Sequence, residues 1–350
     1  MGGDPILSEV VTAREARRPT PQAHTTPAGR SVGLDAVRAI ACVMVVLCHL
    51  TVFGGGEELV GLQNGVMLFF CLSGYLLYRP FVRGRVELHD YVRNRAVRIV
   101  PAYLVALVGV TALSGDRTFL EKPLTFLLLM QNYDPSTWQG FLGVSWTLVL
   151  EVQFYVALPI LAMLVGGSAL RLSVLGAGSF LFVLALAMQP WDVDPRLVTS
   201  TFPAMFWAFV PGMLLALRPD GDRRFRSSWF LIAGIALLIV GTSSPWASVD
   251  VPSALGSFFI VAWTVARQPD LGRVAPLAAA GAAITYSMYL WHVDVIRASG
   301  GGLTAVIAGV AIAGTIYLLI ERPILRLGRA KRSRAAPMAS MPAPVVSPVR

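Results

Sequence analysis

Apolar runs separated by short polar segments fill most of the chain. One run, 119–131, is too short to cross a bilayer and is interrupted by Glu121, Lys122 and Pro123, which predicts a half-helix or an interfacial segment. Ten runs approach the ~17–25 residues that a transmembrane α-helix needs, at about 33–53, 61–79, 97–115, 145–165, 171–189, 201–217, 229–245, 252–267, 277–297 and 303–320. The pattern predicts an all-α fold, a polytopic membrane helical bundle of about ten transmembrane helices.

Composition supports a membrane protein and argues against a soluble one. Hydrophobic residues make up 55% of the 350-residue chain and charged residues 14%, whereas soluble domains carry about 25% charge. So few charges cannot cover a water-facing surface. Cys42, Cys48 and Cys71 all lie in apolar runs. They match no metal-ligand spacing or disulfide framework, and we predict that they are buried small hydrophobic residues.

Basic residues concentrate in alternate loops. With the N-terminus in the cytoplasm, the outer segments hold only Arg117, Lys122, Arg196 and Arg297, and the inner segments hold most of the 29 arginines and lysines. The positive-inside rule then predicts that both termini are cytoplasmic. The net charge of +9 therefore reflects orientation in the membrane, and nucleic-acid binding is not needed to explain it.

The two ends of the chain differ from its middle. Residues 1–30 contain Pro, Thr and Arg but no apolar run before a cleavage-like site, which predicts a disordered cytoplasmic tail and no signal peptide. Residues 329–350 are basic and then Pro-rich, which predicts a second disordered tail. Residues 31–328 are predicted to form one membrane domain. No internal repeat is visible, which weighs against transporter folds built from repeats.

The first span carries two ionisable side chains on one helical face. Arg38 and His49 are eleven residues apart, a spacing that returns nearly to the same angle of an α-helix and separates them by about 16 Å along its axis. Ionisable groups inside a span are costly and suggest function. Asp35 lies one turn from Arg38, so the alternative interpretation is an interfacial ion pair, with His49 as an interhelical hydrogen-bonding residue.

Two other spans place polar residues at a depth similar to that of His49. Glu151 and His292 each lie in the outer half of their span. A carboxylate near an imidazole raises its basicity and orients it, which yields a general base. The cluster could also bind zinc, but no third ligand is fixed, so we predict no metal. Aromatic residues here alternatively form an interfacial belt; together with His292, the candidates for substrate binding are Trp146, Tyr286 and Tyr289.

A basic pair lies at the cytoplasmic mouth of the third span. Arg95 and Arg98 are three residues apart and share a helical face. Paired guanidinium groups suit phosphate recognition because they form bidentate, charge-assisted hydrogen bonds. The alternative interpretation is a topology signal that contacts lipid head groups. Glu321, at the inner end of the last span, could pair with one of these arginines.

Six motifs occur in order along residues 33–325. They read GLDAVRAIACVMVVLCHL, FFCLSGYLL, YVRNRAVRIVPAY, SWTLVLEVQFY, TYSMYLWH and IERP. Together they resemble the acyltransferase-3 family of integral membrane acyltransferases. Val152 follows Glu151 where that family often has a second glutamate, so Glu151 must carry any carboxylate role alone. Thr285 stands where serine is usual.

The resemblance implies acyl transfer from a cytoplasmic acyl-CoA, commonly acetyl-CoA, to a hydroxyl group. Arg38, Arg95 and Arg98 would bind acyl-CoA, which is a co-substrate, so that no cofactor is bound permanently. His49 would act as general base with Glu151 orienting it. Direct base catalysis is the default hypothesis, and a transient acyl-histidine is the alternative. Acceptors in the family include surface polysaccharides, lipid-linked sugars, peptidoglycan and macrolide-type natural products.

We therefore expect a bacterial O-acyltransferase of the inner (plasma) membrane. Its acceptor would be a cell-envelope carbohydrate, a glycolipid or a secreted natural product. Abundant alanine and only two lysines, Lys122 and Lys331, hint at a GC-rich bacterial genome. The rival class is a proton-coupled transporter with a His and Glu relay, although a transporter has no obvious use for the arginine pair unless its substrate is anionic. A non-catalytic partner in an envelope assembly is the third interpretation.

Overall fold

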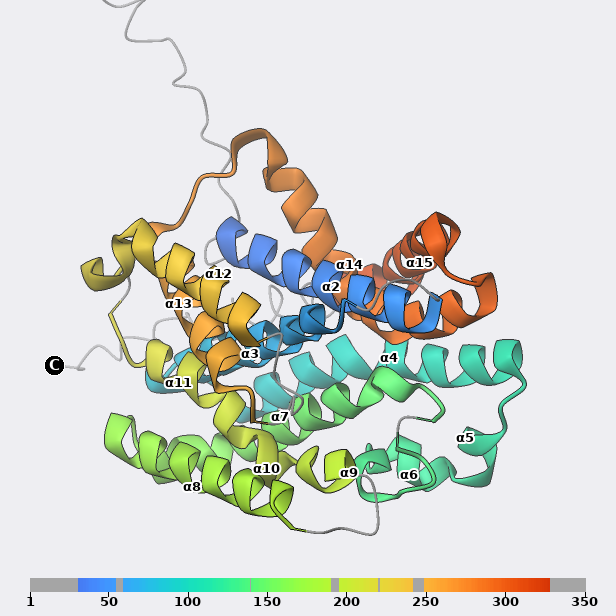
Figure 1. The fold of residues 1–350 in the computed structure, drawn as a ribbon, viewed down its shortest axis with the longest axis horizontal. Helices are drawn as coiled ribbons and strands as arrows, with labels where there is room; N and C mark the ends of the chain where they lie inside the picture. Colours follow the sequence, from blue (N-terminus) through green and yellow to red (C-terminus); the bar gives the residue numbers. More distant parts are fainter. Residues whose placement is uncertain are drawn as a thin grey trace, which may run out of the picture. The chain divides into compact units, whose positions relative to one another are not determined.

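The computed structural model describes residues 31–54, 59–138, 140–189, 195–219, 221–241 and 249–327. Every regular element in these ranges is a helix (Figure 1), which confirms the predicted all-α class. The described helices from Val32 onward belong to one compact unit. The two predicted tails, 1–30 and 329–350, lie outside the described residues.

Seven helical segments in the described ranges are long and apolar enough to cross a membrane. Each coincides with a predicted span, so the chain is a multi-pass membrane protein. The segments are built from α2 (Val32–Gly54), η1 with α3 (Val60–Asn64 and Gly65–Val82), α4 (Leu88–Ser114), η3 with α7 (Gly143–Ser145 and Trp146–Val165), α8 (Ala169–Ala187), η7 with α14 (Gly272–Val274 and Ala275–Ser299), and α15 with the π-helical η8 (Gly302–Ile316 and Tyr317–Glu321).

Two further predicted spans are shorter apolar helices, α12 (Ser228–Gly241) and α13 (Val251–Arg267). The short run at 119–131 contains two brief helices, α5 (Thr118–Glu121) and α6 (Pro123–Leu127), followed by η2 (Gln131–Tyr133). The prediction that this run does not form a full spanning helix is confirmed.

The run at 201–217 is broken. After α9 (Pro195–Thr199) it forms three short pieces, α10 (Phe202–Met205), η4 (Phe206–Ala208) and α11 (Val210–Ala216). Pro203 and Pro211 each stand in the first turn of a new piece, because proline has no N–H to donate within a helix interior. The prediction of one continuous helix here is wrong.

Close helix packing brings distant parts of the chain together. α2 packs against both α14 and α3, and α3 packs against α11. A Cβ atom added at Gly74 would lie 2.2 Å from the Phe209 carbonyl oxygen, and one at Gly212 would lie 1.9 Å from that of Cys71. Only glycine therefore permits this approach of the α3 and α11 backbones. The three cysteines are free and buried, as predicted.

Candidate active site

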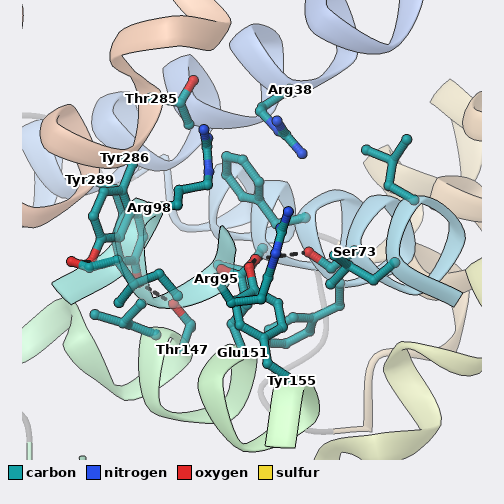
Figure 2. A pocket seen from close by; sticks show the side chains of 17 residues that line it. Arg38, Ser73, Arg95, Arg98, Thr147, Glu151, Tyr155, Thr285, Tyr286 and Tyr289 are labelled. Atoms are coloured by element: carbon teal, nitrogen blue, oxygen red, sulfur yellow. Dashed lines mark hydrogen bonds between the residues drawn. The ribbon is translucent and has the colours of Figure 1, made fainter. Parts of the chain in front are cut away.

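A cavity of about 290 Å³ lies among α2, α3, α4, α7 and α14. Its polar lining combines side chains that are up to about 250 residues apart in sequence, because these helices pack around one space (Figure 2). The polar and aromatic lining residues are Arg38, Ser73, Arg95, Arg98, Thr147, Glu151, Tyr155, Thr285, Tyr286 and Tyr289.

The cavity is predominantly basic. Arg95 and Arg98 enter it from one face of α4, and Arg38 enters from α2. Among the residues that the structure describes, Glu151 is the only carboxylate in its lining. The Arg95 guanidinium lies over the Tyr155 ring at 5.6 Å, and its buried Nε has no hydrogen-bond acceptor among the described residues. A buried guanidinium N–H favours an added acceptor, so the cavity suits an anionic ligand such as a phosphate group.

Glu151 is held by two hydroxyl groups. Its Oε1 accepts hydrogen bonds from Ser73 Oγ at 3.0 Å and from Tyr155 OH at 2.5 Å. Tyr155 is one turn further along α7, whereas Ser73 comes from α3. Glu151 was expected to orient His49, but the structure gives it these partners and gives His49 a different one. The carboxylate therefore lies among the arginines, where it offsets part of their charge.

The partner of His49 is His292. His49 Nδ1 and His292 Nε2 are 2.9 Å apart, and His292 Nδ1 lies 2.7 Å from the Tyr289 carbonyl oxygen and 3.2 Å from that of Met288. Carbonyl oxygens only accept, so His292 Nδ1 must carry a proton, and in the neutral ring its Nε2 accepts from His49 Nδ1–H. When both rings are neutral, this series of hydrogen bonds leaves His49 Nε2 without a proton. The geometry therefore gives His49 a proton-accepting nitrogen.

Tyr289 connects the histidine pair to the cavity. Its side chain lines the cavity, its hydroxyl hydrogen-bonds to the Thr147 hydroxyl and the Val144 carbonyl, and its ring lies 5.7 Å from that of His292. Neither histidine lines the cavity itself. The arginine-lined cavity and the histidine pair are therefore adjacent, with the Tyr289 side chain between them.

A second carboxylate lies near the cavity. Glu321 ends the π-helical turn, is 3% exposed and accepts a hydrogen bond from Ser287 Oγ. Its other oxygen has no partner among the described residues. The charge of Arg98 acts on Glu321, but the ion pairs found among the described residues do not include these two side chains, so the expected pairing stays a prediction.

The predicted site residues fall into three groups. Arg38, Arg95, Arg98, Glu151, Tyr286 and Tyr289 line one cavity, and His49 and His292 form the pair beside it. Trp146 does not line the cavity; its carbonyl accepts from Asn132 Nδ2 at 2.9 Å. Sequence reasoning missed the site hydroxyls of Ser73, Thr147 and Tyr155. The one feature of the sequence that could have indicated them is a hydroxyl group within an otherwise apolar motif. Within the described ranges, no three His, Cys, Asp or Glu side chains are arranged to hold a metal ion.

A family model described as an acyltransferase domain matches residues 31–320 of the chain. The chain belongs to the acyltransferase-3 family. This confirms the resemblance predicted from the six motifs. It also decides between the predicted classes: the protein is a membrane-embedded O-acyltransferase, an enzyme, and the transporter interpretation loses its support.

Relatives of this acyltransferase come from several bacteria. It is 26% identical over 312 residues to nodulation protein 10 of Rhizobium leguminosarum bv. viciae, a match that covers 75% of this chain and 82% of the relative. The exopolysaccharide production protein ExoZ of Rhizobium meliloti (strain 1021) is 27% identical over 304 residues, with 77% and 92% covered. A putative O-acetyltransferase of Staphylococcus aureus (strain COL) is 24% identical over 312 residues, with 75% and 50% covered. No solved structure matches the chain.

Proposed function

We propose that this acyltransferase moves an acetyl group from cytoplasmic acetyl-CoA to a hydroxyl group of a cell-envelope carbohydrate, a glycolipid or a secreted natural product. The observation that carries the proposal is the His49–His292 pair beside an arginine-lined cavity, with Tyr289 in contact with both. The relatives named for exopolysaccharide production and O-acetyl transfer favour a carbohydrate acceptor and an acetyl group.

The topology in this proposal has ten spans and both termini in the cytoplasm of a bacterial inner (plasma) membrane. The seven long segments, α12, α13 and the broken run at 201–217 supply the ten, and the bias of basic residues toward alternate loops supports the orientation. Arg95 and Arg98 then lie toward the cytoplasm, from which acyl-CoA arrives, and His49 lies in the outer half of the membrane.

The three arginines of the cavity would bind the phosphates of acyl-CoA through charge-assisted hydrogen bonds. Arg38 and His49 lie on the same face of α2 and about 16 Å apart along its axis. The extended pantetheine arm of the donor would span that distance and bring the thioester to His49. Glu151, bonded to Ser73 and Tyr155, would limit the positive charge in the cavity and hold its arginines in place.

In the proposed reaction, His49 Nε2 accepts the proton of the acceptor hydroxyl, and the hydroxyl oxygen attacks the carbonyl carbon of the thioester. The C–S bond then breaks, and the proton on His49 passes to the departing thiolate, so that CoA and the ester are the products. His292 accepts the His49 Nδ1–H bond throughout and keeps the imidazole oriented. A covalent acyl-histidine trapped after rapid quench would overturn this direct mechanism.

Label transfer in inside-out membrane vesicles tests the proposal. Vesicles with the wild type and with His49→Ala, Arg98→Ala and Arg273→Ala at equal expression receive radiolabelled acetyl-CoA. Arg273 is exposed on η7 and outside the cavity, so its variant is the matched control. We expect label in a lipid or glycan fraction for the wild type and the control only. Equal labelling in all four preparations would contradict the site, and no labelling in any would contradict acetyl-CoA as donor.

A further inference from the structure

A second cavity, of about 850 Å³, lies between α8, α11 and α13 and shares no lining residue with the arginine-lined one. Its walls are mostly apolar and include Ala177 and Phe180 of α8, Leu214 of α11, and Leu255 and Phe258 of α13. Ala177 and Leu255 are exposed. The cavity is therefore a groove that opens at the surface of the helix bundle.

The side of α8 around this groove is suited to lipid. α8 is one of the seven segments that are long and apolar enough to cross a membrane, and Leu170, Val174 and Leu181 are exposed on it. On a helix long and apolar enough to cross a bilayer, exposed apolar side chains of this kind suit contact with the hydrocarbon core. A groove in this surface would be filled by lipid and not by water.

The groove has a basic end. The α8 and α11 segments run antiparallel: the Phe180 and Trp207 rings are 5.2 Å apart, and a Cβ at Gly176 would lie 3.0 Å from Val210. Arg218, which lines the groove beyond the end of α11, therefore lies at the Ala169 end.

More positive charge lies close to that end. The short helix η5 (Arg223–Arg226) follows Arg218 by a few residues and contributes the arginines at positions 223, 224 and 226. It packs on α13 through Phe225, whose ring is 5.6 Å from the groove-lining Phe258. A ligand with an apolar body and an anionic head matches this distribution of charge.

The length of the groove matches one membrane leaflet. Ala169 and Phe180 both line it, and eleven residues of α-helix span about 16 Å, close to half of the ~30 Å hydrocarbon core of a bilayer. We propose that this groove binds one anionic phospholipid, with an acyl chain along α8, α11 and α13 and its phosphate at Arg218. Basic residues at this level of the membrane attract anionic lipid head groups.

Lipid binding to the purified protein in detergent tests this site without reference to acyl transfer. Phosphatidylglycerol and phosphatidylcholine with identical chains are titrated and the bound fraction is read by native mass spectrometry. We expect phosphatidylglycerol to bind the wild type more tightly. Arg218→Gln should weaken it roughly five-fold, and Arg273→Gln, outside the groove, should not.

A steric pair of variants tests the acyl-chain part. Ala177→Trp should block the binding of both lipids. Ala311→Trp, on the exposed face of α15, should leave binding intact. If the melting temperature of the Ala177→Trp variant in lipid-free detergent falls, Leu255→Trp takes its place. Equal binding of the two lipids to the wild type would overturn the proposal. So would unchanged binding in the groove variants, or full competition by glycerol 3-phosphate, which has no acyl chain.

Discussion

Replacing His292 by leucine should lower kcat and leave the KM for acyl-CoA nearly unchanged. His292 is 1% exposed, accepts from His49 Nδ1 over 2.9 Å and donates from its own Nδ1 to the Tyr289 carbonyl. Leucine has similar bulk but no acceptor, so His49 would lose the partner that keeps its proton on Nδ1. Part of the His49 population would then carry the proton on Nε2 and could not act as base.

The size of the effect depends on the hydrogen bond that is lost. A neutral hydrogen bond contributes about 1 kcal/mol net, and a buried polar group left without a partner costs ~1–3 kcal/mol. A loss of about 1.4–2.7 kcal/mol in the transition state corresponds to a kcat roughly 10–100-fold lower. Because His292 does not line the arginine cavity, the donor KM should change by less than about two-fold.

Initial rates with varied acetyl-CoA, measured on purified protein with the acceptor found by labelling, separate kcat from KM. His292→Gln, whose amide oxygen can accept from His49 Nδ1–H, should recover part of the loss, and melting temperatures report whether each variant is folded. A folded leucine variant with kcat within about two-fold of the wild type would refute the tautomer reasoning. A raised donor KM with normal kcat would refute the separation of the two halves of the site.

Three further predictions concern other parts of the molecule. Arg98→Gln should raise the KM for acyl-CoA roughly ten-fold by removing a charge-assisted hydrogen bond, with Arg98→Lys intermediate; rates at varied donor concentration check this. Gly212→Ala should lower the melting temperature, since its Cβ would lie 1.9 Å from the Cys71 carbonyl oxygen and such overpacking costs about 1–3 kcal/mol. The hydrogen bond from Lys122 lowers the pKa of Asp134 to about 2. This surface pair should therefore contribute its full share of the free energy of unfolding above about pH 4, and that share should be lost as the pH falls toward 2. In acid unfolding, Asp134→Asn should remove this pH dependence, and near neutral pH it should lower the free energy of unfolding by less than about 1 kcal/mol.

The apolar pattern was sufficient for seven of the ten predicted spans, because a helix in lipid must satisfy its own backbone hydrogen bonds over a fixed length. The same logic fails at 201–217, where hydropathy is high but Pro203 and Pro211 divide the run into short pieces. Those prolines are visible in the sequence. Neither hydropathy nor proline by itself reveals the break, because Pro80, Pro101 and Pro159 stand inside the continuous helices α3, α4 and α7.

The site was predicted in its parts but not in its pairing. Depth in the membrane placed His49, Glu151 and His292 at one level, but depth is a single coordinate. Which side chains meet depends on how α2 packs against α14, and His49 and His292 are 243 residues apart in sequence. Ser73, the partner of Glu151, is a lone hydroxyl in an apolar run, and only packing of α3 on α7 reveals it.

The π-helical turn at Tyr317–Glu321 has a consequence for how the last helix faces its neighbours. The buried residues of α15 follow a regular step of four or three, at Ala305, Gly309, Ala313 and Ile316, and the next buried position is Glu321, five residues on. One extra residue in the turn rotates the remainder of the helix by about 100°. The first part of the helix therefore buries mostly small apolar side chains, and its last part buries an acidic side chain on the same face. Deleting a single residue in this turn would bring Arg322 to the buried position of Glu321. The extra residue of the wide turn therefore keeps a carboxylate beside Ser287.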